Sequence, residues 1–416
     1  MDKRMMFKLY ILLIAVTIVF ISTCVLYSEA AENITGDKIV AAADSTDEQL
    51  ADFQYKLIDM AFDTACAIPV KPHIKDRSKT QEAVVDACLQ LDQPIIALSQ
   101  TEKIDDWRRG LCYGKVAFYY AKKGDNDKIS DYLKLADKSA EQTDDWRKDR
   151  IRVVIAQTRT LQGQAQNVKE FEVGLTESES GKISSTQAML CDDESFDEQV
   201  SVLDGYIATG TYDLIRNALD AYSQLFNRFY NDDKKRTVVE DKIKASWEAL
   251  PVFIRVELML NLAGYAIEHK DNVKAVSLVN EAQEILDAYT FRPEHRVEMI
   301  AKLVKMRCQT GDVEKASADA DAALGYFETE CEKIVNIYRC QSLIGLAEAY
   351  QLMGDTQKSL SVYKRCVKES VDNPNSRPRA EDLSAVCRSM ALYKVQPDEE
   401  LWDAIRQTRE GLGQPW

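Results

Sequence analysis

Few residues of this sequence have both the type and the spacing that a phosphate-binding or catalytic site requires. The best candidate for a phosphate-binding loop is Gly174 followed by Gly181-Lys182. Its two glycines are seven positions apart instead of five, and Ile183 occupies the position at which Ser or Thr would bind magnesium. No strand pattern precedes the stretch. We therefore interpret it as a solvated linker rather than a nucleotide site.

Metal binding and acid–base catalysis have few candidate groups in this chain. Imidazole comes only from His73, His269 and His295, and no GxSxG, HExxH or EF-hand pattern occurs. Glu294 and Glu298 would share one helical face and could act as weak metal ligands, although solvated surface charge accounts for them better. The sequence predicts no catalytic residue, no metal and no cofactor.

The ten cysteines are the remaining reactive groups, and nine of them follow the apolar N-terminal segment. They form no CxxC pair, and their spacing differs from that of a small disulfide-stapled domain. Most fall in stretches with apolar helical periodicity, so burial in the core is the favoured interpretation. One or two disulfides, or a metal-bound or reactive thiol, are the alternatives.

The composition is that of a folded, acidic protein. The chain has 416 residues, of which 45% are hydrophobic and 29% charged, and 53 basic against 68 acidic residues give a net charge of −15. Nucleic acid and anionic membrane surfaces need a cationic footprint, which this balance disfavours. Nucleic acid is therefore not an expected partner.

The N-terminus indicates export. Basic residues precede an uncharged run at 9–27, and small residues before Ala30 suit signal-peptide cleavage. The run is also long enough to span a bilayer, so residues 1–30 are predicted to be a signal peptide or an uncleaved signal anchor, followed by a linker at 31–46. Either form places the rest of the chain in the periplasm or outside the cell. Membrane contact is expected only through residues 9–27, if they are not cleaved.

A repeated pattern organises most of the chain. Before Gly124, Val116, Ala117 and Tyr120 follow a helical period, and after it Ile129 begins another. This predicts two antiparallel amphipathic helices, with Gly stopping the first and the following Asp or Asn capping the second. The same arrangement recurs around five further anchor positions, namely Gly163, Gly210, Lys270, Gly311 and Gly354. A basic residue stands fifteen positions before five of the six anchors: Arg109, Lys148, Arg255, Arg296 and Arg339.

The pattern resembles the tetratricopeptide repeat, a helix-turn-helix unit with small or aromatic residues at these relative positions. The best match runs from Leu343 through Gly354-Asp355 to Cys366, and the resemblance covers roughly 100–175 and 196–370. The period here is 39 to 43 residues instead of the family's 34. The resemblance implies an all-α fold: a right-handed solenoid of stacked antiparallel helix hairpins, in one array or two halves.

We accordingly expect four segments after the leader and its linker. These are N-terminal helical repeats at 47–175, a flexible acidic linker at 176–195, C-terminal repeats at 196–396, and a capping helix with tail at 397–416. The segment at 176–195 is assigned as linker because it lacks a helical period and is rich in Ser, Glu and Asp.

The resemblance also implies a binding groove, because the first helices of such repeats line the concave side. The exposed groove positions would then be Phe118, Lys122, Gln157, Leu161, Asp204, Glu257, Glu268, Glu298, Lys305, Glu348 and Gln351. Five of these eleven are acidic, so we expect a protein or peptide partner with basic segments. The expected function is that of a non-enzymatic scaffold. An all-α enzyme using groove carboxylates and a self-associating structural array are the alternatives.

Overall fold

The computed structural model describes residues 50–163 and 173–416. Within these ranges the chain folds into helices and contains no strand, which confirms the all-α prediction. The predicted leader and linker, residues 1–46, lie outside the described residues. In the described part of the chain, no helix combines the length and apolar character needed to cross a membrane.

The helices follow one another with short connections. Those of the first half are α2 (Asp52–Ala67), α3 (Val70–Gln90), α4 (Pro94–Thr101), α5 (Arg108–Lys123), α6 (Ile129–Glu141), α7 (Asp145–Leu161), α9 (Glu177–Gly181), α10 (Ile183–Leu190) and α11 (Phe196–Ala208). Those of the second half are α12 (Tyr212–Arg228), α13 (Asp233–Ser246), η2 (Trp247–Ala249), α14 (Val252–Glu268), α15 (Asn272–Ala288), α16 (Pro293–Thr310), α17 (Val313–Glu330), η3 (Cys331–Lys333), α18 (Asn336–Leu352), α19 (Thr356–Val371), α20 (Ser376–Leu392) and α21 (Glu399–Glu410).

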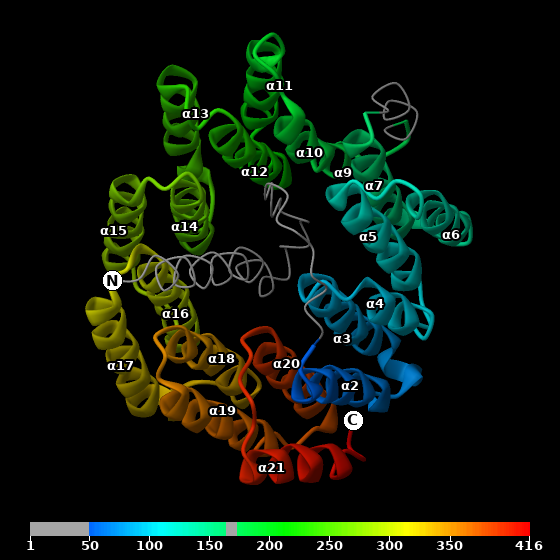
Figure 1. The fold of residues 1–416 in the computed structure, drawn as a ribbon, viewed down its shortest axis with the longest axis vertical. Helices are drawn as coiled ribbons and strands as arrows, with labels where there is room; N and C mark the ends of the chain where they lie inside the picture. The colour runs from blue at the N-terminus through cyan, green and yellow to red at the C-terminus, as the bar shows by residue number, and fades with distance from the viewer. Residues whose placement is uncertain (1–49, 164–172) are drawn as a thin grey trace, which may run out of the picture.

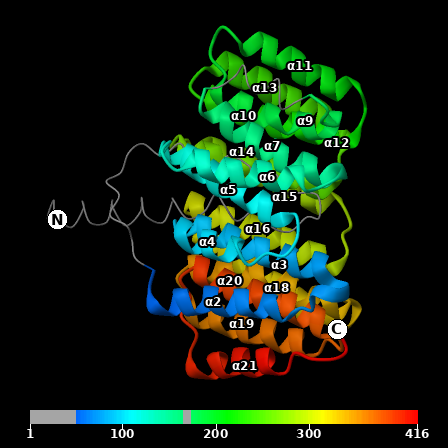
Figure 2. The ribbon, with the colours of Figure 1, turned by 90° about the vertical axis from the view of Figure 1, so that its right-hand side faces the viewer.

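The helices are arranged in a ring of two layers (Figure 1). Helices α5, α7, α12, α14, α16, α18 and α20 lie toward the centre, and α6, α11, α13, α15, α17, α19 and α21 lie outside them. Seen from the side, the helices lie across the long axis of the molecule, with α11 near one end and α21 at the other (Figure 2). Helix α16, for example, packs against its outer partner α17 and against the next inner helix, α18, whereas α7 is connected to α12 through α10, which packs against both.

The predicted hairpin turns have a common backbone conformation. All six anchors, Gly124, Gly163, Gly210, Lys270, Gly311 and Gly354, have positive φ. Two further residues with positive φ, Asp92 and Lys394, end α3 and α20 and mark hairpins that the glycine pattern did not reveal. A side chain in this conformation costs of order 1–2 kcal/mol, which is why glycine is common there.

The residue after the turn caps the outer helix at three of the six anchors, as predicted, but not after Gly124 or Gly210, where α6 and α12 begin without a side-chain cap. The carboxylates of Asp271, Asp312 and Asp355 accept hydrogen bonds from backbone N–H groups three residues ahead, at 2.9, 3.3 and 3.0 Å. Each cap satisfies an N–H group that has no partner within the helix. At Lys270-Asp271, Gly311-Asp312 and Gly354-Asp355 the pair therefore marks the end of one helix and the start of the next.

The repeated basic residue has a structural role at the opposite end of the inner helices. Arg255 Nε donates to the carbonyl of Leu250 at 3.0 Å, and Arg339 Nε donates to the carbonyl of Ile334 at 2.9 Å. Both carbonyls belong to the connection that enters the inner helix. The arginine thus fixes the loop between one hairpin and the next.

The prediction of a flexible linker at 176–195 is wrong. This segment forms α9 and α10, and α10 packs against α7 and α12. Ile183 and Ala188 are fully buried, and the small polar residues Ser184 and Thr186 are buried as well. Because buried Ser and Thr look like solvated residues in a sequence, the segment resembled a linker although it continues the helical array.

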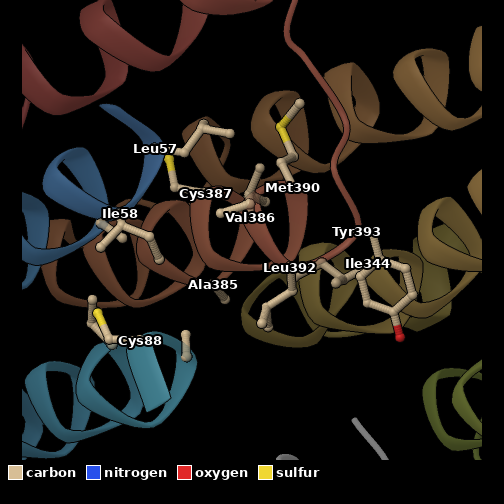
Figure 3. Close-up of a cluster of buried hydrophobic side chains, with 14 of the residues drawn as sticks. Leu57, Ile58, Cys88, Ile344, Ala385, Val386, Cys387, Met390, Leu392 and Tyr393 are labelled. Atoms are coloured by element: carbon tan, nitrogen blue, oxygen red, sulfur yellow. The ribbon is translucent and has the colours of Figure 1, made fainter. Parts of the chain in front are cut away.

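The two ends of the described chain meet and close the ring. Leu57 and Ile58 of α2 pack against Val386, Cys387 and Met390 of α20, and all five are almost fully buried (Figure 3). The corresponding core cluster joins residues between 57 and 155 to residues between 297 and 405. The closing contact between α2 and α20 is called the seam below.

Polar contacts secure the seam. Gln54 Nε2 donates to the carbonyl of Ala391 at 2.8 Å in a buried position. Arg409 of α21 pairs with Asp63 of α2 at 2.7 Å. The predicted C-terminal segment at 397–416 does contain a helix, α21, but α21 is the outer partner of α20 in a last hairpin. The faces that would end an open array are buried against each other.

Candidate functional site

Three consecutive inner helices present the candidate surface. On α14 the residues that remain partly exposed recur every fourth position, at Phe253, Glu257 and Asn261, on the side away from the buried apolar residues. Corresponding stripes continue on the next two helices, and the whole surface is called the inner face below: Phe253, Glu257, Asn261, Glu298, Lys302, Ile337 and Gln341. Helices α14, α16 and α18 border the centre of the ring side by side (Figure 1).

Four of the predicted groove residues are buried, so their assignment as exposed positions is wrong. Phe118, Gln157, Lys305 and Glu348 have exposed fractions of 3, 5, 7 and 8%. All four stand six residues before a turn anchor. In this ring that position points into the contact between neighbouring helices and does not point to solvent.

Lys305 and Glu348 form the centre of a buried polar network. Lys305 Nζ lies 2.6 Å from one carboxylate oxygen of Glu348, and Ser389 Oγ donates to the other at 2.7 Å. The hydroxyl groups of Tyr363 and Ser389 lie 2.7 Å apart. Burial, reinforced by the Glu348 carboxylate, raises the pKa of Tyr363 well above its usual value. The network joins α16, α18, α19 and α20, so Glu348 serves the fold and cannot meet a partner.

The carboxylates that stay at the inner face are also engaged. Glu257 pairs with Lys302 of the next inner helix, and both side chains are largely covered. The Glu298 carboxylate lies 3.6 Å from His295 Nδ1 and raises the pKa of that imidazole. The remaining predicted groove residues on inner helices are half-buried: Lys122, Leu161, Glu268 and Gln351. The inner face is therefore less negative than its residue types suggested.

Asp204 does not belong to the inner face. It lies on α11, in the outer layer, because α12 and not α11 continues the inner series at this point. Its carboxylate accepts a hydrogen bond from the hydroxyl of Tyr222 at 2.8 Å and pairs with Lys242 of α13 at 2.6 Å. Burial, together with this contact, raises the pKa of Tyr222. The turn at Gly210 was correctly placed, but its two helices were assigned to the wrong layers.

The phosphate-loop candidate has the geometry of a helix junction. Gly181 and Lys182 join α9 to α10, and Lys182 Nζ pairs with Glu179 at 2.9 Å. A Cβ atom at Gly181 would lie 2.9 Å from the side-chain amide nitrogen of Asn217 on α12, so glycine allows a close approach of this junction to α12. Within the described residues, no group of three or more His, Cys, Asp or Glu side chains could hold a metal ion.

The nine described cysteines are free thiols, seven of them buried and two partly exposed. Burial raises the pKa of most of them, to about 12 for Cys88 and Cys387 and about 11 for Cys308. A thiol that stays protonated is a poor nucleophile. Their placement agrees with the favoured interpretation as small core residues.

One polar residue of the inner layer escaped the sequence pattern. Asp382 on α20 is almost fully buried and accepts a hydrogen bond from Gln341 Nε2 of α18 at 2.5 Å. Burial raises its pKa well above the usual value for an aspartate. The turn after α20 carries Lys394 instead of glycine, which hid this last hairpin. Because Lys270 already stands at such a turn, testing the other lysines for the same role would have extended the repeat to α20.

The chain matches no family model and no curated protein. Its resemblance to the tetratricopeptide repeat therefore depends on the spacing of its residues and on the hairpins they form. What the molecule does has to be inferred from the surfaces described above.

Proposed function

We propose that this protein is an exported, non-catalytic scaffold that binds a partner protein or peptide on its inner face. Its hairpins would be a divergent form of the right-handed tetratricopeptide-like solenoid. The observation that carries the proposal is the inner face itself. Three neighbouring helices, α14, α16 and α18, present partly exposed apolar and polar side chains in register, where no reactive group is assembled.

The inner face is preorganised for binding. The ion pair between Glu257 and Lys302 connects α14 to α16, and the buried pair between Lys305 and Glu348 connects α16 to α18. These pairs fix the relative positions of the helices. The surface is therefore already ordered before a partner binds, and binding costs little conformational entropy in the scaffold. A preformed surface of this kind suits repeated recognition of one segment.

The composition of the inner face indicates the kind of segment it would hold. Phe253 and Ile337 are 36 and 39% exposed and offer apolar contacts in the first turns of α14 and α18. Glu298 contributes negative charge between them, and Asn261 offers an amide that can donate and accept hydrogen bonds. A partner segment with apolar anchors and at least one basic residue is complementary to this surface.

The structure makes the two alternative functions less attractive. Catalysis by groove carboxylates needs acids that reach a substrate, whereas Glu348 and Glu257 are held in ion pairs within the fold. End-to-end stacking needs free terminal faces, whereas α2 and α20 bury theirs at the seam. Protein binding on an exposed surface requires neither accessible catalytic acids nor free terminal faces.

Co-purification tests the proposal. The protein is captured after cross-linking from an extracytoplasmic fraction of its source cells, as wild type and with Asn261→Arg. The matched control is Gln142→Arg, which adds the same charge to an exposed residue at the end of the outer helix α6. We expect one stoichiometric partner whose yield falls about tenfold with Asn261→Arg and stays unchanged with the control. Equal yields from both variants, or capture of a second copy alone, would refute the proposal.

A further inference from the structure

The outer surface carries a groove that the proposed function does not use. It lies between α17 and α21, over α19, and encloses about 690 Å³. Its floor and walls include apolar and basic side chains, among them Leu324, Lys364, Lys368, Val371, Arg379 and Ala404. This surface is called the outer groove below. Its volume falls in the range of about 300–1,000 Å³ that is usual for binding clefts.

The outer groove has room for about half the cross-section of a helix. The lining residues of α19 extend from Ser361 to Asp372, which corresponds to a length of about 17 Å at 1.5 Å per residue. Dividing the volume by this length gives a cross-section of about 40 Å², against about 80 Å² for a helix about 10 Å wide. A helix could therefore sink one face into the groove and leave the other face in solvent.

The lining also favours a helical ligand over an extended one. The groove is walled by α17, α19 and α21, whose backbone N–H and C=O groups bond within their own helices. An extended segment would find no backbone partners there, whereas a helix satisfies its own backbone. Recognition would then rest on side chains, as in other helix-in-groove complexes.

The charges of the groove select an acidic ligand. Arg365 is neutralised by Glu328 at 3.1 Å, and Lys364 pairs with Asp398 at 2.8 Å. Lys368 is exposed, and no carboxylate within the described residues pairs with it. Arg379 lines the groove as well, and its Nε donates to the carbonyl of Asn373. Glu400, which also lines the groove, pairs with Lys364 as well, and one further lining carboxylate, Asp372, lies at the same end as Lys368 and Arg379. Two cationic groups against one carboxylate leave this end of the groove with a net positive charge on a protein whose net charge is −15.

We propose that the outer groove binds an acidic amphipathic helix of a partner protein. Apolar residues of that helix would cover Val371, which is 46% exposed, and the wall at Ala404. Its carboxylates would face Lys368 and Arg379. The site is separate from the inner face, so it can be occupied whether or not the inner face binds a partner.

Two synthetic helical peptides test the proposal. Each has about 14 residues, a stripe of leucines, and either glutamates or lysines on the flanking positions, with a fluorescent label. Binding is followed by fluorescence anisotropy at physiological ionic strength, where charges are screened beyond about 8 Å. We expect the acidic peptide to bind wild type at least about tenfold more tightly than the basic one.

Three variants locate the binding. Lys368→Glu should weaken the acidic peptide about tenfold, whereas Lys138→Glu, the same charge change on the exposed side of α6, should change its affinity less than about twofold. Ala404→Phe fills the groove without changing charge and should also weaken binding. Circular dichroism confirms that each variant is folded. Equal losses in Lys368→Glu and Lys138→Glu, unchanged binding in Ala404→Phe, or no binding of either peptide to wild type would overturn the proposal.

Discussion

The seam makes a prediction that an open array does not share: removing buried atoms from α2 should destabilise α20, at the other end of the chain. The chosen change is Ile58→Ala, because Ile58 is 1% exposed and packs within the seam. The substitution removes three buried carbon groups, worth about 2.4 kcal/mol at about 0.8 kcal/mol each. The cavity left behind adds to this, so we expect a loss of about 3–4 kcal/mol of unfolding free energy.

Two measurements separate a global loss from local fraying. Urea unfolding followed by circular dichroism gives the change in unfolding free energy. Hydrogen exchange read by mass spectrometry shows where the loss is felt, and amides of α20 around Val386–Met390 should exchange faster in Ile58→Ala. The control is Ile95→Ala on α4, whose side chain is 79% exposed and should cost less than about 0.5 kcal/mol.

The closed ring would be refuted by a specific pattern. If Ile58→Ala accelerates exchange only in α2 and α3 and leaves α20 unchanged, the two ends do not support each other. A stability loss no larger than that of Ile95→Ala would lead to the same conclusion. Either result would favour an open array with two free ends over a closed ring.

Three further changes test the interior of the inner layer. Glu348→Gln leaves Lys305 buried without its carboxylate and should cost about 3–5 kcal/mol in urea unfolding, whereas the double change Lys305→Met/Glu348→Leu should recover most of it; an equal loss in both would refute the pairing. Asp382→Asn should gain about 1–2 kcal/mol at pH 8 and almost nothing at pH 4. The sign follows because the pKa of Asp382 is raised in the fold, so its contribution is present at low pH and lost as pH rises through that pKa; no gain at pH 8 would contradict the burial of this carboxyl. Ala347→Leu should overpack a fully buried contact and cost about 1–3 kcal/mol in thermal unfolding, and an unchanged melting temperature would refute that contact.

Local structure was readable from the sequence because its causes are local. Gly354 followed by Asp355 predicts that one helix ends and the next is capped there. The structure shows the positive φ of Gly354 and the cap at Asp355. The same logic failed at Lys394: lysine takes the place of glycine there, as it does at Lys270, at a modest cost in backbone energy, but only Lys270 was recognised as a turn. It failed at 176–195 as well, because buried Ser and Thr side chains resemble those of a loop.

The candidate site was harder to predict because it depends on how the hairpins are arranged. Phe118 and Glu348 stand at equivalent repeat positions, and the resemblance placed both in an exposed groove. In this ring that position lies in the contact between neighbouring helices, where both side chains are buried. Closure of the ring depends on small rotations summed over every hairpin, so the contact of Gln54 with Ala391 could not be seen in any single repeat.

The most direct test of partner binding on the inner face is site-specific photo-cross-linking. A photoreactive amino acid is placed at Asn261 on the inner face and, in a second variant, at Gln142 beside α6. Both variants are irradiated in the extracytoplasmic fraction of the source cells. We predict one adduct with a single partner polypeptide from position 261 and none from position 142. The same adducts from both positions, or no adduct from position 261, would contradict the assignment of the inner face as the binding surface.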